Sequence, residues 1–156
     1  MELLAEFPDQ IFIPGSYFMY SPSNRAIVYD KKRIKRDDGK LALLHELGHA
    51  HLDHKMYKYD MQLINMEMDA WDYARAMAQQ FNIPIDEDHI AATIASYDAW
   101  LSKRATCPDC ANFSLQSGRD AYACFACGSK WTVNWRKDRR VKRTITARYR
   151  HVHAVA

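Results

Sequence analysis

Two histidines with a glutamate between them form the pattern in this chain that is most specific for chemistry. In His45-Glu46-Leu47-Gly48-His49 the two imidazoles are four residues apart, so on a helix both project from one face and can reach the same ion. Glu46 then lies beside the open coordination position, where a carboxylate can take a proton from a metal-bound water. The pattern predicts a catalytic zinc site with His45 and His49 as ligands and Glu46 as general base.

The spacing of the sequence leaves the third protein ligand of such a site open. The acidic and histidine side chains downstream are His51, Asp53, His54, Glu67, Asp69 and His89. Asp53 and His54 lie on or just beyond the same helix, which must turn away before another of its side chains can reach the ion. Glu67 follows at a distance that allows a helix end, a loop and the start of a second helix. Asp69 is about 200° further round that second helix, so Glu67 and Asp69 cannot both face the metal.

Four cysteines in two close pairs predict a second metal site. The pairs are Cys107-Pro108-Asp109-Cys110 and Cys124-Phe125-Ala126-Cys127. Each CxxC forms a tight turn that aims two thiolates at one ion, and two such turns complete a closed tetrahedral site. In a reducing compartment this arrangement favours metal over disulfides. We therefore expect a structural zinc in a small ribbon of two β-hairpins, folded largely by its metal.

The C-terminal end combines positive charge with aromatic residues. From Trp131 onward the chain contains Trp135, Arg136, Lys137, Arg139, Arg140, Lys142, Arg143, Arg148, Tyr149 and Arg150, with Asp138 as the one acidic residue. Arginine interleaved with aromatics is typical of phosphate contact and base stacking. A solvated tail and a segment that binds an acidic protein have the same composition, so all three interpretations remain open at this point.

Charge is distributed unevenly along the 156 residues. Residues 1–104 contain 12 Lys/Arg and 16 Asp/Glu, a net charge of −4, whereas residues 105–156 contain 10 and 3, a net charge of +7. The overall composition, 48% hydrophobic and 26% charged, is that of a globular protein and excludes a disordered or fibrous chain. We expect a catalytic domain over 1–104, a zinc ribbon over 105–135 and a basic tail over 136–156.

Short apolar runs predict strands in the first thirty residues. Ile11–Ile13 is followed by a turn signal at Pro14-Gly15, and Tyr17–Tyr20 and Ala26–Tyr29 flank the polar break Ser21–Arg25. The last two runs are typical of a hairpin. Ala26–Tyr29 is either a core strand or a strand to which an extended substrate peptide adds.

Helical periodicity predicts three helices after these strands. The first runs from about Gly39 to about His54 with Asp37 or Asp38 as its cap, the second is Gln62–Phe81, and the third begins after Asp86 as cap. The predicted fold class is α+β, with a hairpin or short sheet and three helices followed by the ribbon. No apolar run approaches the length of a membrane span. The acidic N-terminal residues do not resemble a secretory signal, which predicts a cytoplasmic protein.

The stretch Leu44–Ala50, with His54 after it and Glu67–Ala74 further on, resembles the ImmA/IrrE family of metallopeptidases, which belongs to the gluzincins. That family has HELGH followed by an E-x-E-A-x-x-F-A-like helix, and the similarity extends over roughly residues 14–85. The resemblance implies a zincin-like fold and Glu67 as the third zinc ligand. It also implies a zinc metalloendopeptidase that cleaves a specific protein, such as a repressor.

The sequence departs from the family in two places. Trp71 stands where gluzincins often have an Asp or Asn that supports a zinc histidine, so that support comes from another residue or is missing. The zinc ribbon is not part of the family core. A donor to the developing oxyanion is also needed, and the side chains near enough in sequence are His51, His54, Tyr57, Tyr59 and Tyr73.

Two other functions compete with this prediction. SprT-like proteases also join HExxH to a C-terminal zinc ribbon and cut proteins crosslinked to DNA, but they use a third histidine, and none lies between His54 and His89. A non-catalytic regulator that binds nucleic acid or protein could keep the metal as a structural or vestigial site. Glu46 speaks against that alternative, because a structural site needs no general base.

Overall fold

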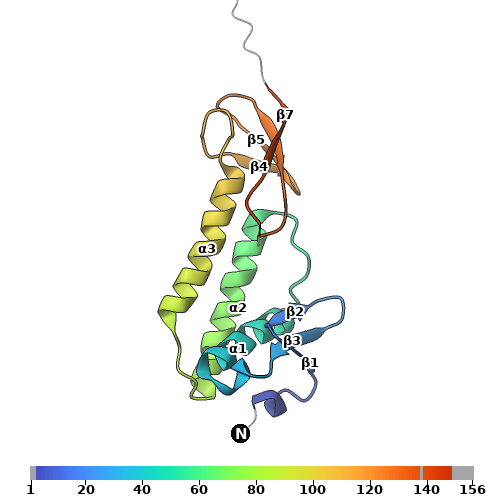
Figure 1. Cartoon of the computed structure of the whole chain (residues 1–156), viewed down its shortest axis with the longest axis vertical. Coiled ribbons are helices and arrows are strands. Elements are labelled where there is room, and N and C mark those ends of the chain that lie inside the picture. Colours follow the sequence, from blue (N-terminus) through green and yellow to red (C-terminus); the bar gives the residue numbers. More distant parts are fainter. Residues whose placement is uncertain (1–2, 138, 149–156) are drawn as a thin grey trace, which may run out of the picture. The chain divides into compact units, whose positions relative to one another are not determined.

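The protein is an α+β chain with three helices and two small sheets, seen in a computed structural model that describes residues 3–137 and 139–148. It divides into two compact units: unit 1 takes its described residues from 1–57 and 62–94, and unit 2 takes them from 58–61 and 95–156. The boundary expected after residue 104 lies inside unit 2, at the end of the third helix. Figure 1 shows the elements coloured along the sequence.

The sheet of unit 1 has three strands in the order β1-β3-β2. β1 (Ile11–Gly15) runs parallel to β3 (Ala26–Asp30), and β2 (Met19–Ser21) pairs with β3 antiparallel, which confirms the predicted hairpin. The turn predicted at Pro14-Gly15 is wrong, because both residues lie in β1, an edge strand where proline is tolerated. Strand addition of a peptide to β3 is also wrong, since β3 is paired on both sides and forms part of the core.

The first predicted helix is confirmed as α1 (Asp37–His51), preceded by the short 3-10 helix η2 (Arg33–Lys35). The predicted aspartate cap is wrong. Arg36 occupies the N-cap position, without a side-chain cap hydrogen bond, and Asp37 and Asp38 lie in the first turn. Asp38 instead pairs with the guanidinium groups of Arg33 and Arg36, which explains why its carboxylate does not cap the helix.

Two longer helices follow, α2 (Asp60–Gln80) and α3 (Glu87–Ala105). The predicted cap of α3 is confirmed, because Oδ1 of Asp86 accepts a hydrogen bond from the backbone N–H of His89 at 2.9 Å. The core of unit 1 lies between α1, the sheet and the parts of α2 and α3 in this unit, and η1 (Leu3–Glu6) contributes to it. The largest buried side chains of this core are Ile27, Leu41, Leu43, Leu44, Trp71 and Ile90.

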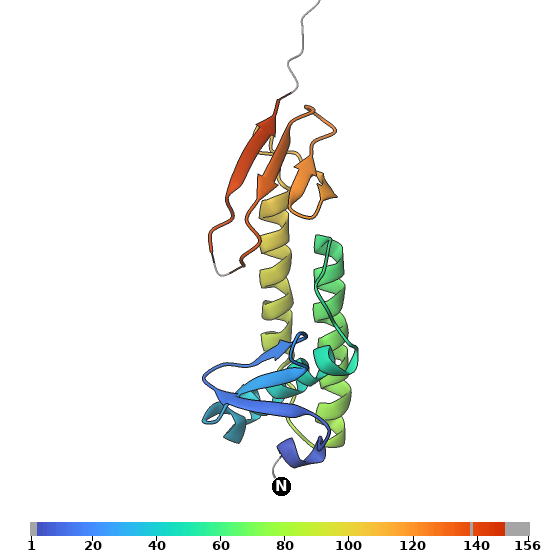
Figure 2. The same cartoon turned by 90° about the vertical axis from the view of Figure 1, so that its right-hand side faces the viewer.

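Unit 2 contains a four-stranded antiparallel sheet, shown in orange to red in Figure 2. Its strands are β4 (Leu115–Gly118), β5 (Ala121–Ala123), β6 (Lys130–Val133) and β7 (Arg143–Ala147), hydrogen-bonded in that order. β7 belongs to the segment expected as a basic tail, so part of that segment is a strand. Tyr149 and Arg150 lie outside the described residues.

The core of unit 2 is small and partly ionic. Tyr122 and Trp131 stack with ring centroids 5.5 Å apart and are both buried. Beside them the fully buried Arg104 pairs with Asp60 at 3.0 Å, and the hydroxyl of Tyr122 also donates to Asp60. Asp120 completes the group at 3.4 Å from Arg104.

Among the described residues, every helix is too short or too polar to cross a bilayer.

Candidate metal centres

The structure brings His45 and His49 of α1 together with Glu67 of α2. Their ligand atoms all lie within 4.8 Å of one another. The Nε2 atoms of the two histidines are 3.1 Å apart. Nε2 of His45 lies 3.3 Å from Oε2 of Glu67, and Nε2 of His49 lies 3.8 Å from Oε1 of the same carboxylate. The two histidines predicted from their spacing and the glutamate implied by the family resemblance therefore converge on one point.

A close crossing of α1 and α2 produces this convergence. A Cβ atom built at Gly48 would lie 2.7 Å from the backbone oxygen of Ala70 and 2.9 Å from its Cα, so only glycine permits the two backbones to approach this far. Gly48 lies between the two histidines in α1, and Glu67 lies just under one turn before Ala70 in α2. The crossing consequently sets Glu67 opposite both imidazoles.

The donor set fits a divalent metal ion with an open coordination position. Two imidazole nitrogens and a carboxylate oxygen are a usual set of zinc ligands in hydrolytic sites. To bind the ion, both histidines must be neutral and the carboxylate must be ionised. Burial, together with the neighbouring His45, lowers the pKa of His49 to about 4, so this imidazole is neutral at physiological pH. The group could therefore hold a metal ion.

His54 contacts one of these histidines, a contact that sequence reasoning missed. Its Nδ1 lies 2.8 Å from Nδ1 of His49. If His49 donates this hydrogen bond, its proton is fixed on Nδ1 and the lone pair of Nε2 remains free for a metal. The two ring planes are 65° apart and the ring centroids 5.0 Å apart, so the rings meet edge on rather than stacking.

The end of α1 explains how His54 reaches that position. The backbone N–H of His54 bonds to the carbonyl of His49 at 2.9 Å, and that of Asp53 bonds to Ala50 at 3.2 Å. Asp53 itself adopts a φ of 51°. This is the Schellman pattern of a helix C-terminus, which folds the chain back over the last turn. The sequence signal for the contact between His54 and His49 is an Asp-His pair just after an amphipathic helix, and this signal is weak.

His45 has no comparable support. Its Nδ1 is buried and, within residues 3–137 and 139–148, has no hydrogen-bond partner. The ring of Trp71 lies against it instead, with centroids 4.1 Å apart and planes 31° apart. Trp71 thus packs against the histidine at the position where gluzincins often have a carboxylate or amide.

Glu46 lies on the same helix and contacts β2. Its Oε2 accepts a hydrogen bond from the backbone N–H of Tyr20 at 2.6 Å. Burial raises the pKa of the Glu46 carboxyl, while the charge of His45 and the Tyr20 hydrogen bond act in the opposite direction. A carboxylate with a raised pKa is a better proton acceptor, which suits a general base.

The other ligand candidates lie outside the cluster formed by His45, His49 and Glu67. His51 stacks on Tyr73, with centroids 4.9 Å apart, and both line a cavity of about 280 Å³. Asp53 pairs with Lys55, Asp69 is exposed, and His89 meets Trp71 edge on. Of the suggested oxyanion donors, His54 is hydrogen-bonded to His49, and Tyr59 belongs to unit 2.

The four cysteines of unit 2 form the second cluster. Cys107 Sγ lies 3.6 Å from Cys127 Sγ, Cys110 Sγ lies 3.5 Å from Cys124 Sγ, and all four sulfurs are within 4.8 Å of one another. Two matching turns hold them. The backbone N–H of Ala111 donates to the carbonyl of Cys107, and that of Gly128 donates to the carbonyl of Cys124. Ala111 and Gly128 adopt positive φ values of 61° and 73°. The set could hold a metal ion in a closed tetrahedral site.

The surroundings of the cysteines favour thiolates at one pair. Hydrogen bonds from Ser114 and from the backbone of Cys127 lower the pKa of Cys124 to about 6. Ser129 lowers the pKa of Cys127 in the same way. Burial raises the pKa of Cys107 to about 11. A bound cation would be needed to keep all four sulfurs ionised together.

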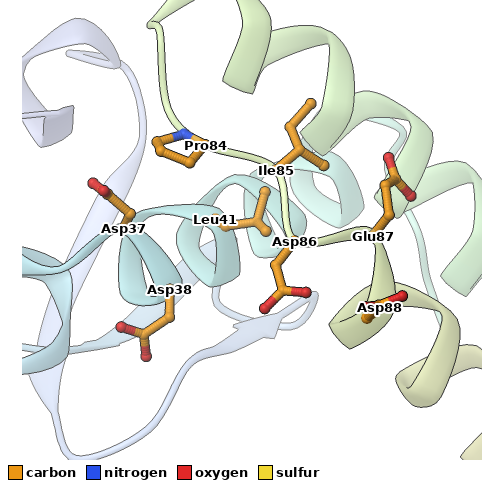
Figure 3. Close-up of a pocket in the computed structure, with 8 residues that line it drawn as sticks. All are labelled: Asp37, Asp38, Leu41, Pro84, Ile85, Asp86, Glu87 and Asp88. Carbon is orange, nitrogen blue, oxygen red and sulfur yellow. The ribbon is translucent and has the colours of Figure 1, made fainter.

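A further cavity, of about 500 Å³, is lined mainly by carboxylates (Figure 3). The lining residues are Asp37, Asp38, Leu41, Pro84, Ile85, Asp86, Glu87 and Asp88. Four of these carboxylates are already used, because Asp37 pairs with Lys40, Asp38 pairs with Arg33, Asp86 caps α3 and Glu87 pairs with Arg75. The cavity contains neither metal cluster, and we do not assign it a ligand.

Comparisons with known proteins give no family for the chain: no family model, no curated protein and no solved structure matches it.

Proposed function

We propose that this chain is a zinc-dependent metallopeptidase that hydrolyses peptide bonds of a specific protein substrate, as its resemblance to the ImmA/IrrE family implies. The observation that carries the proposal is the convergence of His45, His49 and Glu67 on one point, with Glu46 one residue along the helix from His45. A zinc ion in this set supplies Lewis acidity towards a carbonyl oxygen and makes water a better nucleophile. We also propose zinc for the four cysteines, as a structural ion.

The residues of the chain supply the proton transfers. Glu46 takes the proton from the attacking water and then passes it to the leaving amine. The Tyr20 N–H holds the carboxylate of Glu46 in place at 2.6 Å. With Nδ1–H of His49 donated to His54, the lone pair of His49 Nε2 would be free to hold the metal.

The edge of the sheet in unit 1 supports a peptide as substrate. β2 is an edge strand, paired with β3 on one side only, and its Tyr20 N–H is directed to Glu46. An extended peptide that pairs with the open edge of β2 would bring its backbone carbonyls close to Glu46. The peptide would thus pair with β2 and not with β3, for which the sequence left open either a core role or peptide binding and which has no open edge.

The third-ligand geometry distinguishes this proposal from a SprT-like protease. The ligand that converges with the two HExxH histidines is a glutamate, whereas His89 packs against Trp71. The other alternative is a non-catalytic regulator, and an experiment is needed to distinguish it from a metallopeptidase.

Replacing Glu46 by Gln distinguishes a peptidase from a non-catalytic regulator. We expect Glu46→Gln to lose about 10²- to 10⁴-fold in peptidase rate, the usual contribution of a general base, while it keeps its metal. The assay is cleavage of a protein-derived peptide library, read by mass spectrometry, with metal content measured on the same samples. The matched control is Glu6→Gln, an exposed glutamate of unit 1. Equal cleavage patterns for the wild type and Glu46→Gln would contradict the proposal.

A further inference from the structure

The loop between β6 and β7, residues 134–142, gathers positive charge around one exposed aromatic side chain. Its cationic residues are Arg136, Lys137, Arg139, Arg140 and Lys142, against Asp138 as its one acidic residue. Trp135 is 68% exposed, whereas the chain's other three tryptophans are buried. The exposed indole therefore lies beside the positive charges of the loop, where its flat face is open to a ligand.

The base of this loop is closed by Asn134. Its Oδ1 accepts a hydrogen bond from the backbone N–H of Lys142 at 2.6 Å, and its Nδ2 donates to the carbonyl of Arg140 at 3.3 Å. Its own carbonyl accepts from Nη1 of Arg104 at 2.5 Å. Because Arg104 is buried and paired with Asp60, the residue before Trp135 is anchored to the core of unit 2.

A second anchor follows two residues after Trp135. The ammonium of Lys137 lies 3.3 Å from the ring centroid of Tyr97 and 2.9 Å from Oγ of Ser96, both on α3 within unit 2. Trp135 therefore stands between two fixed points of the chain. A side chain presented in this way needs little further ordering when a ligand binds.

The remaining charges of the loop are available to a ligand. Arg139, Arg140 and Lys142 are exposed, and in the part of the chain that the structure describes they form no ion pair with a carboxylate. Arginine contacts phosphate oxygens through a planar fork, while an indole offers a flat face to a base. An acidic polypeptide would use the charges only, and a duplex hides the faces of its bases.

We propose that the β6–β7 loop binds single-stranded nucleic acid, with Trp135 stacked on a base and with Arg139, Arg140 and Lys142 in contact with phosphates. This function lies beyond the peptidase and does not depend on it, so Glu46→Gln is expected to bind nucleic acid as the wild type does.

The test is fluorescence anisotropy of labelled oligo(dT) and oligo(U) of about 16 nucleotides, titrated with the full-length zinc-loaded protein at several salt concentrations. Trp135→Ala should weaken binding about 5- to 150-fold, the value of one stacked base, and leave the salt dependence unchanged. Arg139→Gln with Arg140→Gln should reduce the slope of log binding constant against log salt by about 1.4, since each phosphate contact on a single strand contributes about 0.7.

Two matched variants serve as controls. Phe113→Ala removes an aromatic side chain of unit 2 that lies outside both CxxC pairs and is 70% exposed, and Lys31→Gln with Lys32→Gln removes two exposed positive charges of unit 1. Both should bind like the wild type, and zinc content verifies that each variant is folded.

Three results would overturn the proposal. The first is the absence of binding to either oligonucleotide. The second is equal binding of a duplex together with an unchanged affinity of Trp135→Ala, which would indicate phosphate contact alone. The third is displacement of the oligonucleotide by polyglutamate at the same charge concentration, which would indicate a surface for acidic protein.

Discussion

The two candidate metal centres of this protein are built in opposite ways. The four cysteines lie on two short turns, each closed by a backbone hydrogen bond to the first cysteine of its own CxxC pair. His45 and His49 meet Glu67 only because two helices cross at Gly48 and Ala70. The first centre is therefore set by local geometry and the second by tertiary packing. The difference predicts that the cysteine site should hold its unit together, whereas the histidine site should depend on a unit that folds without it.

Loss of the cysteine site is the largest effect that we expect. Cys124→Ser with Cys127→Ser should remove one metal equivalent and unfold the sheet of unit 2, because binding of a structural zinc ion supplies about 10–16 kcal/mol in small zinc domains. His45→Ala with His49→Ala should remove the other equivalent and leave the protein folded. Metal analysis and near-ultraviolet circular dichroism of the full chain measure both. Unfolding by the histidine variant, or a folded sheet in the cysteine variant, would break the comparison.

Gly48→Ala tests the helix crossing. Its methyl group would overlap the backbone of Ala70, and such overpacking typically costs about 1–3 kcal/mol of unfolding free energy. We expect the histidine site to lose affinity for zinc as α1 and α2 separate, while the cysteine site keeps its ion. Urea denaturation and metal titration measure the two effects.

The matched control for Gly48 is Gly118→Ala. A Cβ atom at Gly118 would lie 3.6 Å from the Cβ of Ala121, an ordinary contact, so little change is expected. Equal behaviour of the two alanine variants would mean that the close crossing does not position Glu67.

His54→Ala tests the support of one ligand. Loss of a hydrogen-bonding partner of a metal-bound histidine typically weakens metal affinity about 10- to 100-fold. We expect a loss in that range for the histidine site, measured by competition with a chromogenic chelator. His51→Ala is the control, since His51 stacks on Tyr73 and does not contact a ligand. An unchanged affinity in His54→Ala would show that the 2.8 Å contact to His49 carries no support.

Asn112→Ala should have the smallest effect. Nδ2 of Asn112 donates to Sγ of Cys110 at 3.4 Å. One such bond contributes about 1 kcal/mol net, so zinc retention by the cysteine site should fall about fivefold. The same chelator competition measures it. A loss of zinc affinity larger than that of His54→Ala would contradict the comparison. The cysteine site would then depend more on its supporting contacts than the histidine site does.

Sequence reasoning was most informative where spacing alone determines geometry. The helix that contains His45 and His49 and the two CxxC turns follow from residues four or fewer positions apart. Glu67 could not be chosen from spacing, because its placement depends on the angle at which α2 crosses α1. The resemblance to a family was needed to prefer it over Asp69.

The features that sequence reasoning missed depend on contacts distant in the chain or on competition between partners. The parallel pairing of β1 with β3 makes β3 a central strand, and no local signal marks it. Asp38 could cap α1, but two guanidinium groups bind it instead. His54 reaches His49 through a turn at Asp53, where a non-glycine residue adopts a positive φ.

Arg104 restricts the transfer of unit 2 to another protein. Its guanidinium needs the carboxylate of Asp60 and the carbonyl of Asn134, and its own carbonyl accepts the indole N–H of Trp131 at 3.0 Å. A fragment of residues 95–148 would keep the buried positive charge and the more distant Asp120 but lose Asp60, and loss of one partner of a buried ion pair typically costs about 3–5 kcal/mol. The sheet of unit 2 is for this reason not a portable module. Transplanting it onto another protein requires a carboxylate at the position of Asp60, supplied by a segment that is remote in sequence.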